Sequence, residues 1–365
     1  MNIEVFEKEN RTRVGIITVY SYASYSEQFN DAGSFTLSIP GILYTDILKK
    51  NNFILFDNEN LGIIKYVGIT MNKKDTLQVK GILLNGILSY RVISTQQNFS
   101  GTPESICEEI VGSNFVNPSD EKRKIPSFTV SSTEPASEEE VKKSVTGKDV
   151  LTAVSSLLET KEYGFEVRPT ISTYDESSDN PTNISEMTFK VLHPADRSVN
   201  NSEGNDPVVF SLEMNNLKEM FYDMDATQEC STAIVAGENT GSSRTVVETG
   251  DIYAEGFDRI ELYVDARDLQ DVTETELKQR GNEKLEDNKE FTSFDCSLLN
   301  TAAERYKKDF FLGDYVTAMD KRLNISVKTQ IKQVIHSSTG SDNVIDIIFG
   351  SEKTTLYELL KKGEI

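Results

Sequence analysis

The sequence has no tryptophan, two histidines and three cysteines among its 365 residues. Cys107, Cys230 and Cys296 are odd in number, far apart and without a CxxC pair, which excludes a disulfide framework. We expect reduced, mostly buried thiols in a protein made in a reducing cytosol. No run of about eighteen apolar residues occurs, and the N-terminus carries charges where a signal peptide needs an apolar stretch. A soluble chain without a secretion signal is therefore expected.

The common catalytic signatures are also missing, including the nucleophile elbow, the phosphate-binding loop and the HExxH zinc motif. His193 and His336 lack Cys, Asp or Glu at zinc-ligand spacing, so we expect them to be solvated or locally hydrogen-bonded. Residues 57–62 resemble the start of a calcium loop, but Gly68 stands where the bidentate acid is required, which favours a hairpin turn. No catalytic residue, metal ligand or cofactor is predicted, and we expect a protein that is not an enzyme.

Acidic residues dominate the charge, with 59 Asp and Glu against 38 Lys and Arg. Residues 1–100 are nearly neutral, with 10 basic and 9 acidic side chains, whereas residues 101–365 carry 28 and 50. Such a balance repels phosphates and anionic lipid headgroups at long range. Specific binding of nucleic acid or membrane through bulk charge is therefore not expected.

Residues 1–100 have the pattern of short antiparallel strands. Phe35, Leu37 and Ile39 alternate with hydroxyl-bearing residues, so they fall on one face of a strand. Two apolar runs, 53–56 and 61–69, flank a polar turn and predict a hairpin. This spacing is typical of a small barrel or sandwich.

A mixed α+β module follows. Thr102 and Pro103 form the start signal of a helix that ends near Gly112, and the apolar stripe of residues 148–161 predicts a second helix before a strand at 165–167. Polar stretches with few apolar residues predict two long exposed loops, at residues 117–144 and 172–183.

The sequence pattern predicts strands again after Pro207. A capping box at Thr273 opens a helix with a thin apolar stripe, little more than Leu277 and Leu285, so that helix should be mostly solvated. The expected strands lie at residues 208–212, 232–236, 260–265, 325–331 and 344–349. The predicted fold class is α+β, mainly β: two related antiparallel β-barrels with an inserted mixed module and peripheral helices. The predicted domains are residues 1–100, 101–206, 207–350 with its helix near 273–288, and a C-terminal helix at 351–365.

Several segments, taken in order, carry a family resemblance. They are residues 29–40, 117–126, 150–164, 193–197, 208–211, 216–217, 264–269, 311–316 and 349–350. Together they resemble a tail-hub family of long-tailed phages and phage-like particles, of the ReqiPepy-phage type, which is similar to the hub of contractile tails and to the N-terminal region of tail-associated lysins. The signature residues are Gly33, Phe35, Pro40, Arg197, Phe210, Gly313, Asp314 and Gly350.

These residues also have a physical interpretation. Gly33 and Gly313 can supply a positive φ or a close backbone approach before a strand, and Asp314 can accept backbone hydrogen bonds in its turn. Phe35, Phe210 and Phe311 are expected in the core, and none of these residues is expected to be catalytic.

The resemblance implies a structural hub in which both barrels are tube-like. A homotrimer would present six such domains to a six-fold tail tube and taper to a three-fold tip. The implied partners are further copies of the chain, the tail tube or distal tail protein, a spike, fibre or tip protein, and a tape-measure protein. DNA would pass through the channel without specific binding, and the location would be the virion tail tip after synthesis in the host cytoplasm.

Two alternatives are a tail-associated cell-wall hydrolase lacking its catalytic domain and a receptor-binding adhesin. About fifteen residues follow the last predicted strand, so we expect no appended hydrolase domain, and we find neither repeats nor heptads typical of an adhesin. The acidic surplus has two interpretations. It could line the channel so that DNA slides without sticking, or it could simply keep an abundant subunit soluble.

Overall fold

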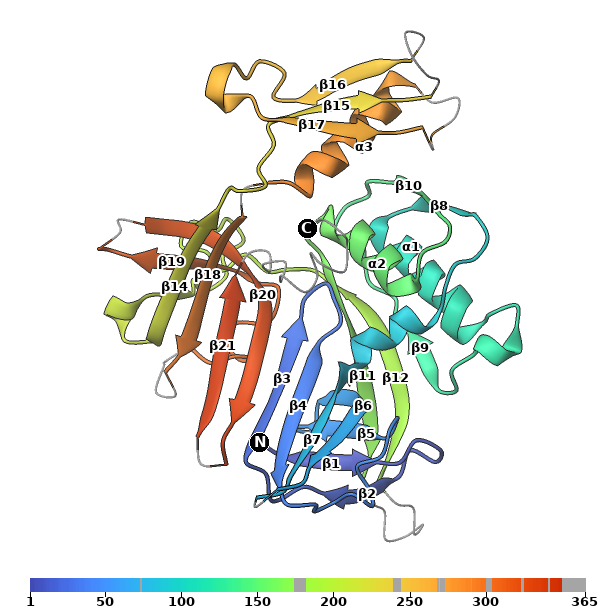
Figure 1. Cartoon of the computed structure of the whole chain (residues 1–365), viewed down its shortest axis with the longest axis vertical. Helices are drawn as coiled ribbons and strands as arrows, with labels where there is room; N and C mark the ends of the chain where they lie inside the picture. Colours follow the sequence, from blue (N-terminus) through green and yellow to red (C-terminus); the bar gives the residue numbers. More distant parts are fainter. Residues whose placement is uncertain are drawn as a thin grey trace. The chain divides into compact units, whose positions relative to one another are not determined.

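The fold is mainly β, with antiparallel sheets and few helices, as the sequence predicts (Figure 1). The computed structural model describes residues 1–72, 74–173, 182–238, 244–267, 269, 273–289, 291–299, 304–322, 325–340 and 342–349. Contacts divide the described residues into two compact units, one within residues 1–220 and 295–349 and the other within residues 221–294. Among the described residues, no helix has the length and apolar character needed to span a membrane.

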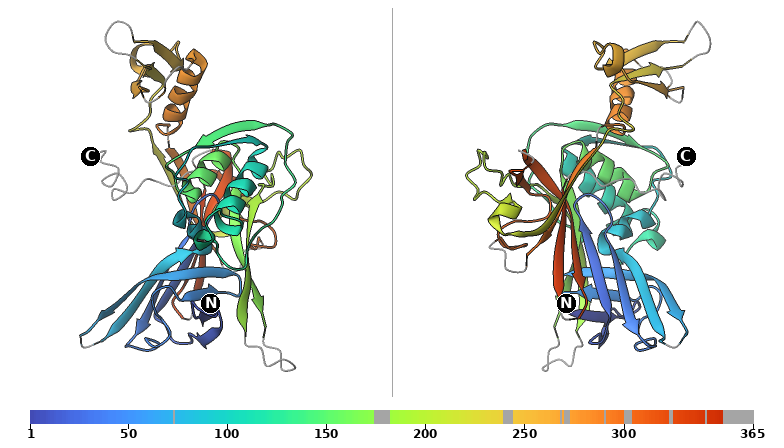
Figure 2. Two further views of the ribbon diagram at one scale, coloured as in Figure 1. Left: turned by 90° about the vertical axis from the view of Figure 1, so that its right-hand side faces the viewer. Right: turned by 60° about the vertical axis from the view of Figure 1, so that its left-hand side comes forward.

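One large sheet joins strands from both ends of the sequence, in the order β14-β18-β21-β20-β3-β4-β7-β6-β5-β1-β2, and β19 pairs with β20 and β13. The strands are β1 (Ile3–Phe6), β2 (Arg13–Ile16), β3 (Tyr22–Gln28), β4 (Ser34–Pro40), β5 (Phe53–Phe56), β6 (Asn60–Thr70), β7 (Thr76–Leu83), β13 (Val209–Phe210), β14 (Leu217–Asp225), β18 (Phe291–Leu298), β19 (Tyr315–Asp320), β20 (Ile325–Ser338) and β21 (Asn343–Phe349). Because β20 pairs antiparallel with β3, strands from residues 1–100 and from residues 207–350 meet edge to edge (Figures 1 and 2).

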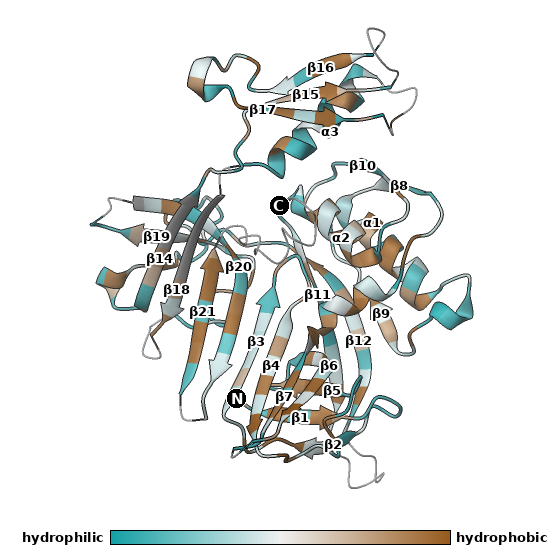
Figure 3. Ribbon diagram, in the orientation of Figure 1, coloured by the Kyte–Doolittle hydropathy of each residue, from teal (hydrophilic) through white to brown (hydrophobic). Residues whose placement is uncertain are grey.

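Alternation along the strands decides which face of this sheet is buried. In β4, Phe35, Leu37 and Ile39 are buried, while the intervening residues are half-buried or exposed. All four residues of β5 are buried because both of its faces are covered. Figure 3 shows the contrast, with β3 in white and teal and β5 in brown. The strand and hairpin predictions for this region are confirmed.

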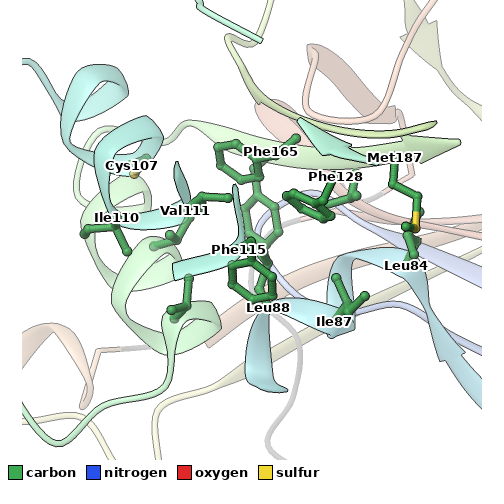
Figure 4. Close-up of a cluster of buried hydrophobic side chains, with 14 of the residues drawn as sticks. Leu84, Ile87, Leu88, Cys107, Ile110, Val111, Phe115, Phe128, Phe165 and Met187 are labelled. Atoms are coloured by element: carbon green, nitrogen blue, oxygen red, sulfur yellow. The ribbon is translucent and has the colours of Figure 1, made fainter. Parts of the chain in front are cut away.

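A mixed layer packs beside the sheet. It contains α1 (Pro103–Val111), α2 (Val150–Glu159), the 3-10 helix η1 (Leu84–Tyr90), the π-helical turn η2 (Gly112–Val116), the 3-10 helix η3 (Glu121–Arg123), the sheet of β11 (Gly164–Ser172), β12 (Asn183–Leu192) and β9 (Phe128–Val130), and the pair β8 (Gln97–Gly101) and β10 (Val141–Val145). The predicted cap of α1 forms, since Thr102 accepts from the Ser105 N–H, and α2 is capped by Asp149, which accepts from the Thr152 N–H. Figure 4 shows the aromatic centre of this core, where the Phe115 and Phe128 rings lie 5.2 Å apart.

The second unit contains a three-stranded sheet with one helix packed on it. Its strands β16 (Val246–Gly250), β15 (Thr232–Ala236) and β17 (Glu261–Asp265) pair in that order, and α3 (Glu274–Glu286) contacts all three. Thr273 and Glu276 form the predicted capping box. Leu277 and Leu285 are buried, and most other described side chains of α3 are exposed, as predicted. Two short 3-10 turns complete the described elements, η4 (Leu212–Met214) and η6 (Gly256–Asp258).

The loop prediction for residues 117–144 is wrong in part. This segment contains β9, which runs parallel to β12, and β10, which pairs antiparallel with β8. Strand β10 is polar, and both strands obtain their backbone partners from distant segments, which local composition does not reveal. Most of the second predicted loop, residues 174–181, and the predicted helix at 351–365 lie outside the described residues. The four predicted domain ranges remain a prediction.

Candidate functional site

A buried cluster of charged side chains lies where β20 meets β3. Glu27 of β3 pairs in register with Val334 of β20, and His336 stands two residues further along that strand. A cavity of about 820 Å³ in the first unit is lined in part by Glu27, Arg168 and Lys307. The cluster therefore combines the sheet junction, strand β11 and the segment around residue 307.

Glu27 is the centre of this cluster and is 4% exposed. Its Oε2 atom lies 3.1 Å from Arg168 Nη2 and 3.2 Å from Lys307 Nζ, and its Oε1 atom lies 3.1 Å from His336 Nε2. Burial alone raises the pKa of Glu27, but the His336 hydrogen bond and the charges of Lys307 and Arg168 outweigh burial and lower it to about 2. The carboxylate is therefore ionised throughout the neutral range.

An outer set of partners balances the two cations. Arg168 Nε lies 2.7 Å from Glu166 Oε2, its Nη1 donates to Asn60 Oδ1 at 2.6 Å, and Lys307 Nζ lies 2.8 Å from Glu59 Oε2. The period of two along β11 places Glu166 and Arg168 on one face. The predicted hairpin turn, whose first two residues both have positive φ, positions Glu59 and Asn60 at the start of β6.

Aromatic rings enclose the histidine. His336 stacks on Tyr25 with ring centroids 4.5 Å apart, and the Tyr306 ring lies 5.5 Å away on the same histidine. Burial and the nearby Glu27 charge raise the pKa of both Tyr25 and Tyr306, so their hydroxyls stay neutral. Both histidines are hydrogen-bonded, but the expectation of solvated or local roles is wrong, because their partners are far away in sequence, Glu27 for His336 and Glu104 for His193.

The charges of this cluster hold segments of the chain together; they are not arranged for proton transfer. A carboxylate with a lowered pKa, paired to two cations, holds no proton to donate near neutral pH. Within the described residues, no group of three or more His, Cys, Asp or Glu side chains is placed to hold a metal ion. The ion pairs have a structural role, because they link β3 and β20 to β11, to the β5–β6 turn and to residue 307.

Three signature residues form a second constellation. Asp314 is 4% exposed, and its carboxylate accepts from the backbone N–H groups of Phe311 and Ala195 and pairs with Arg197 Nε at 2.9 Å. Gly313 has φ of +95°, and a Cβ there would lie 2.1 Å from the Phe29 ring. The predicted turn roles of Gly313 and Asp314 are therefore confirmed.

The other signature residues are scattered. A Cβ on Gly33 would lie 2.0 Å from Ser26 O, which confirms the close approach, and Pro40 ends β4. Phe35 and Phe210 are buried as expected, but Phe311 is 44% exposed, so its predicted core role is wrong. The buried side chain at this point is the neighbouring Phe310, which packs on Phe210 at 5.2 Å. Gly33, Arg197 and Asp314 line the cavity, and Gly350 lies outside the described residues.

The Glu27 cluster is not among the features predicted from the sequence. One signal was available, since Glu27 follows Ala23 and Tyr25 at the period of two and so falls on the buried face of β3. A carboxylate at such a position requires buried partners. Its partners could not be named from the sequence, because Glu27 and His336 are 309 positions apart.

The fold is that of phage tail proteins. The 43 kDa tail protein of prophage MuSo2 from Shewanella oneidensis matches with a TM-score of 0.59 at 13% identity, over 96% of this chain and 98% of that chain. A tail protein from Neisseria meningitidis MC58 matches with a TM-score of 0.58 at 12% identity, over 96% of both chains. Prophage tail protein gp18 from Listeria monocytogenes EGD-e matches with a TM-score of 0.53 at 13% identity, over 100% of this chain and 98% of that chain.

The family follows from the sequence match. The family model described as Siphovirus ReqiPepy6 Gp37-like protein matches residues 2–351, and the chain belongs to this family. A chain in the lidded PdpA–VgrG complex of Francisella also shares the fold, with a TM-score of 0.53 at 12% identity over 97% of this chain and 53% of that chain. No curated protein matches the sequence. The predicted resemblance to a phage tail family is confirmed.

Proposed function

We propose that the chain is the structural hub at the tip of a phage tail or tail-like particle, where three copies form a ring around the channel. The observation that carries the proposal is the large sheet, which contains two four-stranded arrays in one polypeptide. The first array is β3, β4, β7 and β6, the second array is β14, β18, β21 and β20, and they join at the β20–β3 pair. Three copies would supply six arrays, which is the number a six-fold tube requires.

The free edges of the arrays suggest how the ring closes. Pairing of β6 with β5 covers only Asn60–Ile63, so the far half of β6 has no described strand on that side, and β14 is the last strand at the opposite end of the sheet. Unpaired edges of this kind extend a sheet into a neighbouring chain. Joining the β6 edge of one copy to the β14 edge of the next is a head-to-tail contact, which generates a closed ring when the rotation fits.

Exposed apolar side chains beside the β6 edge support this contact. Val67 and Ile69 are 38% and 42% exposed, although their register partners Val79 and Leu77 are fully buried. The row of apolar core side chains therefore continues to the edge of β6, where its last members are exposed. A neighbouring strand would cover it.

The Glu27 cluster has a role in this proposal, because it stands at the junction of the two arrays. Ion pairs with β11 and residue 307 on one side of the junction hold β3 and β20 at a fixed angle. A hub needs such a fixed angle, since an error in each copy would prevent the ring from closing.

The partners are then the tail tube or distal tail protein on one side and a tip, spike or fibre protein on the other, with a tape-measure protein as a further neighbour. The structural match to a chain in a PdpA–VgrG complex is consistent with a place in a tip assembly. No reaction is required of the chain, so release of peptidoglycan fragments by the purified protein would contradict the proposal.

Particle assembly tests the proposed edge. We expect Val67→Glu to leave a folded protein that is missing from purified particles, because a carboxylate would be buried at the ring contact. The control is Val246→Glu, at a valine that is 54% exposed on β16 of the second unit, and this variant should be incorporated normally. Normal incorporation of the Val67 variant, with the three-fold ring intact, would refute the proposed contact.

A further inference from the structure

The second unit presents apolar side chains to the solvent on the segment that joins β16 to β17 (Figure 1). Tyr253 is 86% exposed and Phe257 is fully exposed, and Ile252 and Ile260 beside them are 45% and 44% exposed. We call residues 251–260 the aromatic loop. Single exposed apolar residues are normal on a protein surface, but a concentration of large ones on one loop is of the kind that marks an interaction site.

Hydrogen bonds hold the aromatic loop in a defined conformation while its apolar side chains stay exposed. The Asp251 carboxylate accepts from the Tyr253 N–H at 3.1 Å, and the Asp251 carbonyl accepts from Thr232 Oγ1 of β15 at 2.8 Å. Further along the loop, the Asp258 N–H donates to Glu255 O at 3.2 Å in turn η6. A loop that is ordered beforehand loses little conformational entropy when a partner covers it.

Free carboxylates accompany the exposed apolar side chains. Glu255 and Asp258 are exposed, and within the part of the chain that the structure describes neither carboxylate has an ion-pair or hydrogen-bond partner. The one cation of the loop, Arg259, is already paired, with its Nη2 atom 3.1 Å from Glu248 Oε2 and its Nε atom 2.7 Å from Glu261 Oε1. The surface around the aromatic rings is therefore negatively charged.

We propose that the aromatic loop docks a second protein of the particle through a basic surface that surrounds an apolar pocket. Phe257 and Tyr253 are the anchors that enter the pocket, and Lys or Arg side chains of the partner pair with Glu255 and Asp258. This inference goes beyond the proposed ring, because the loop lies on neither of the two ring edges. The loop also lies at the opposite end of β16 from Val246, whose substitution is the control for ring assembly.

The charge of the second unit favours this occupant over others. Residues 221–294 carry 18 acidic and 7 basic residues, so they hold −11 of the formal charge of −21. A second copy of this unit would bring two strongly anionic surfaces together, and anionic lipid headgroups would be repelled as well. A cationic protein surface is instead attracted and oriented at long range. Aromatic side chains that enter a pocket then supply most of the binding energy at such an interface.

Photo-cross-linking in purified particles identifies the occupant. Phe257 is replaced by p-benzoyl-phenylalanine, which keeps an aromatic ring at this position, and the irradiated particles are analysed by mass spectrometry. We expect a cross-link to another protein of the particle, at a peptide with a net positive charge. The matched control carries the same group at Thr275, an exposed position of α3 in the same unit, and should give no such cross-link. A cross-link only to an acidic peptide, to a second copy of this chain or to a glycan, or no cross-link at all, would overturn the proposal.

Charge reversal tests the basic character of the partner. Glu255→Lys with Asp258→Lys, in the chain that carries the cross-linker, should lower the cross-link yield by about tenfold or more, because cations then face the cations of the partner. Glu138→Lys with Glu140→Lys makes the same change in net charge at exposed carboxylates of the first unit, and should leave the yield unchanged. Each preparation is first checked by mass spectrometry for a normal content of the variant chain. An unaltered yield from the loop variant would overturn the proposal.

Discussion

Replacing Glu27 by glutamine removes one negative charge from the centre of the buried cluster and keeps nearly the same shape. Arg168 and Lys307 each lose an ion-pair partner, while the new amide can still accept a hydrogen bond from His336. Breaking a buried pair on one side is costly, because it leaves a cation without full compensation. We therefore expect the first unit to lose stability without changing its fold.

The pKa of Glu27 sets the magnitude and its pH dependence. A carboxyl with a pKa of about 4.3 in the unfolded chain and about 2 in the folded chain contributes about 3 kcal/mol at pH 7. Because the folded pKa is the lower one, this contribution is present above the unfolded pKa of about 4.3 and is lost as the pH falls toward about 2. By the same relation it amounts to about 2 kcal/mol at about pH 3.5.

A local probe of unfolding is available in the first unit. Met187 is 1% exposed, so its oxidation by hydrogen peroxide across a urea series, measured by mass spectrometry, reports the free energy of unfolding around it. We expect Glu27→Gln to lower that free energy by about 3 kcal/mol at pH 7 and by about 2 kcal/mol at about pH 3.5. Glu140→Gln, at an exposed carboxylate, is the control and should change it by less than about 0.5 kcal/mol. A loss below about 0.5 kcal/mol at pH 7, or an equal loss at both pH values, would refute the reasoning.

Three further predictions concern stability and use urea denaturation. Gly313→Ala should lower the free energy of unfolding by more than about 1 kcal/mol, because it adds a Cβ at positive φ against the Phe29 ring. An unchanged free energy of unfolding would contradict that geometry. Phe310→Ala should lower the free energy of unfolding by about 3 to 5 kcal/mol, and Phe311→Ala should lower it by less than about 1 kcal/mol. The reverse order would support the core role that the sequence predicts for Phe311. Thr273→Ala should lower the stability of the second unit by about 1 kcal/mol through loss of the capping box, and an unchanged second transition would argue against the cap.

Elements whose signals are local are predictable from the sequence. The alternation in β4, the caps at Thr102 and Asp149 and the box at Thr273 each depend on residues within a few positions of one another. Each is therefore visible in the order of residue types. The family motifs likewise indicate the correct tail family, because their succession spans almost the whole chain.

Features that depend on distant pairing are not predictable in this way. Strand β9 has only three residues and β10 is polar, and they become strands because β12 and β8 supply backbone partners. Phe310 and Phe311 are adjacent and of one type, so the sequence cannot tell which of them points inward; in the structure Phe310 packs on Phe210 and Phe311 is exposed.

Electron cryo-microscopy of the intact tail tip tests the central claim most directly. We expect a three-fold ring in which the β6 edge of each copy pairs with the β14 edge of the next. A tip in which this chain is a peripheral monomer, or a ring in which other strand edges meet, would contradict the proposed function.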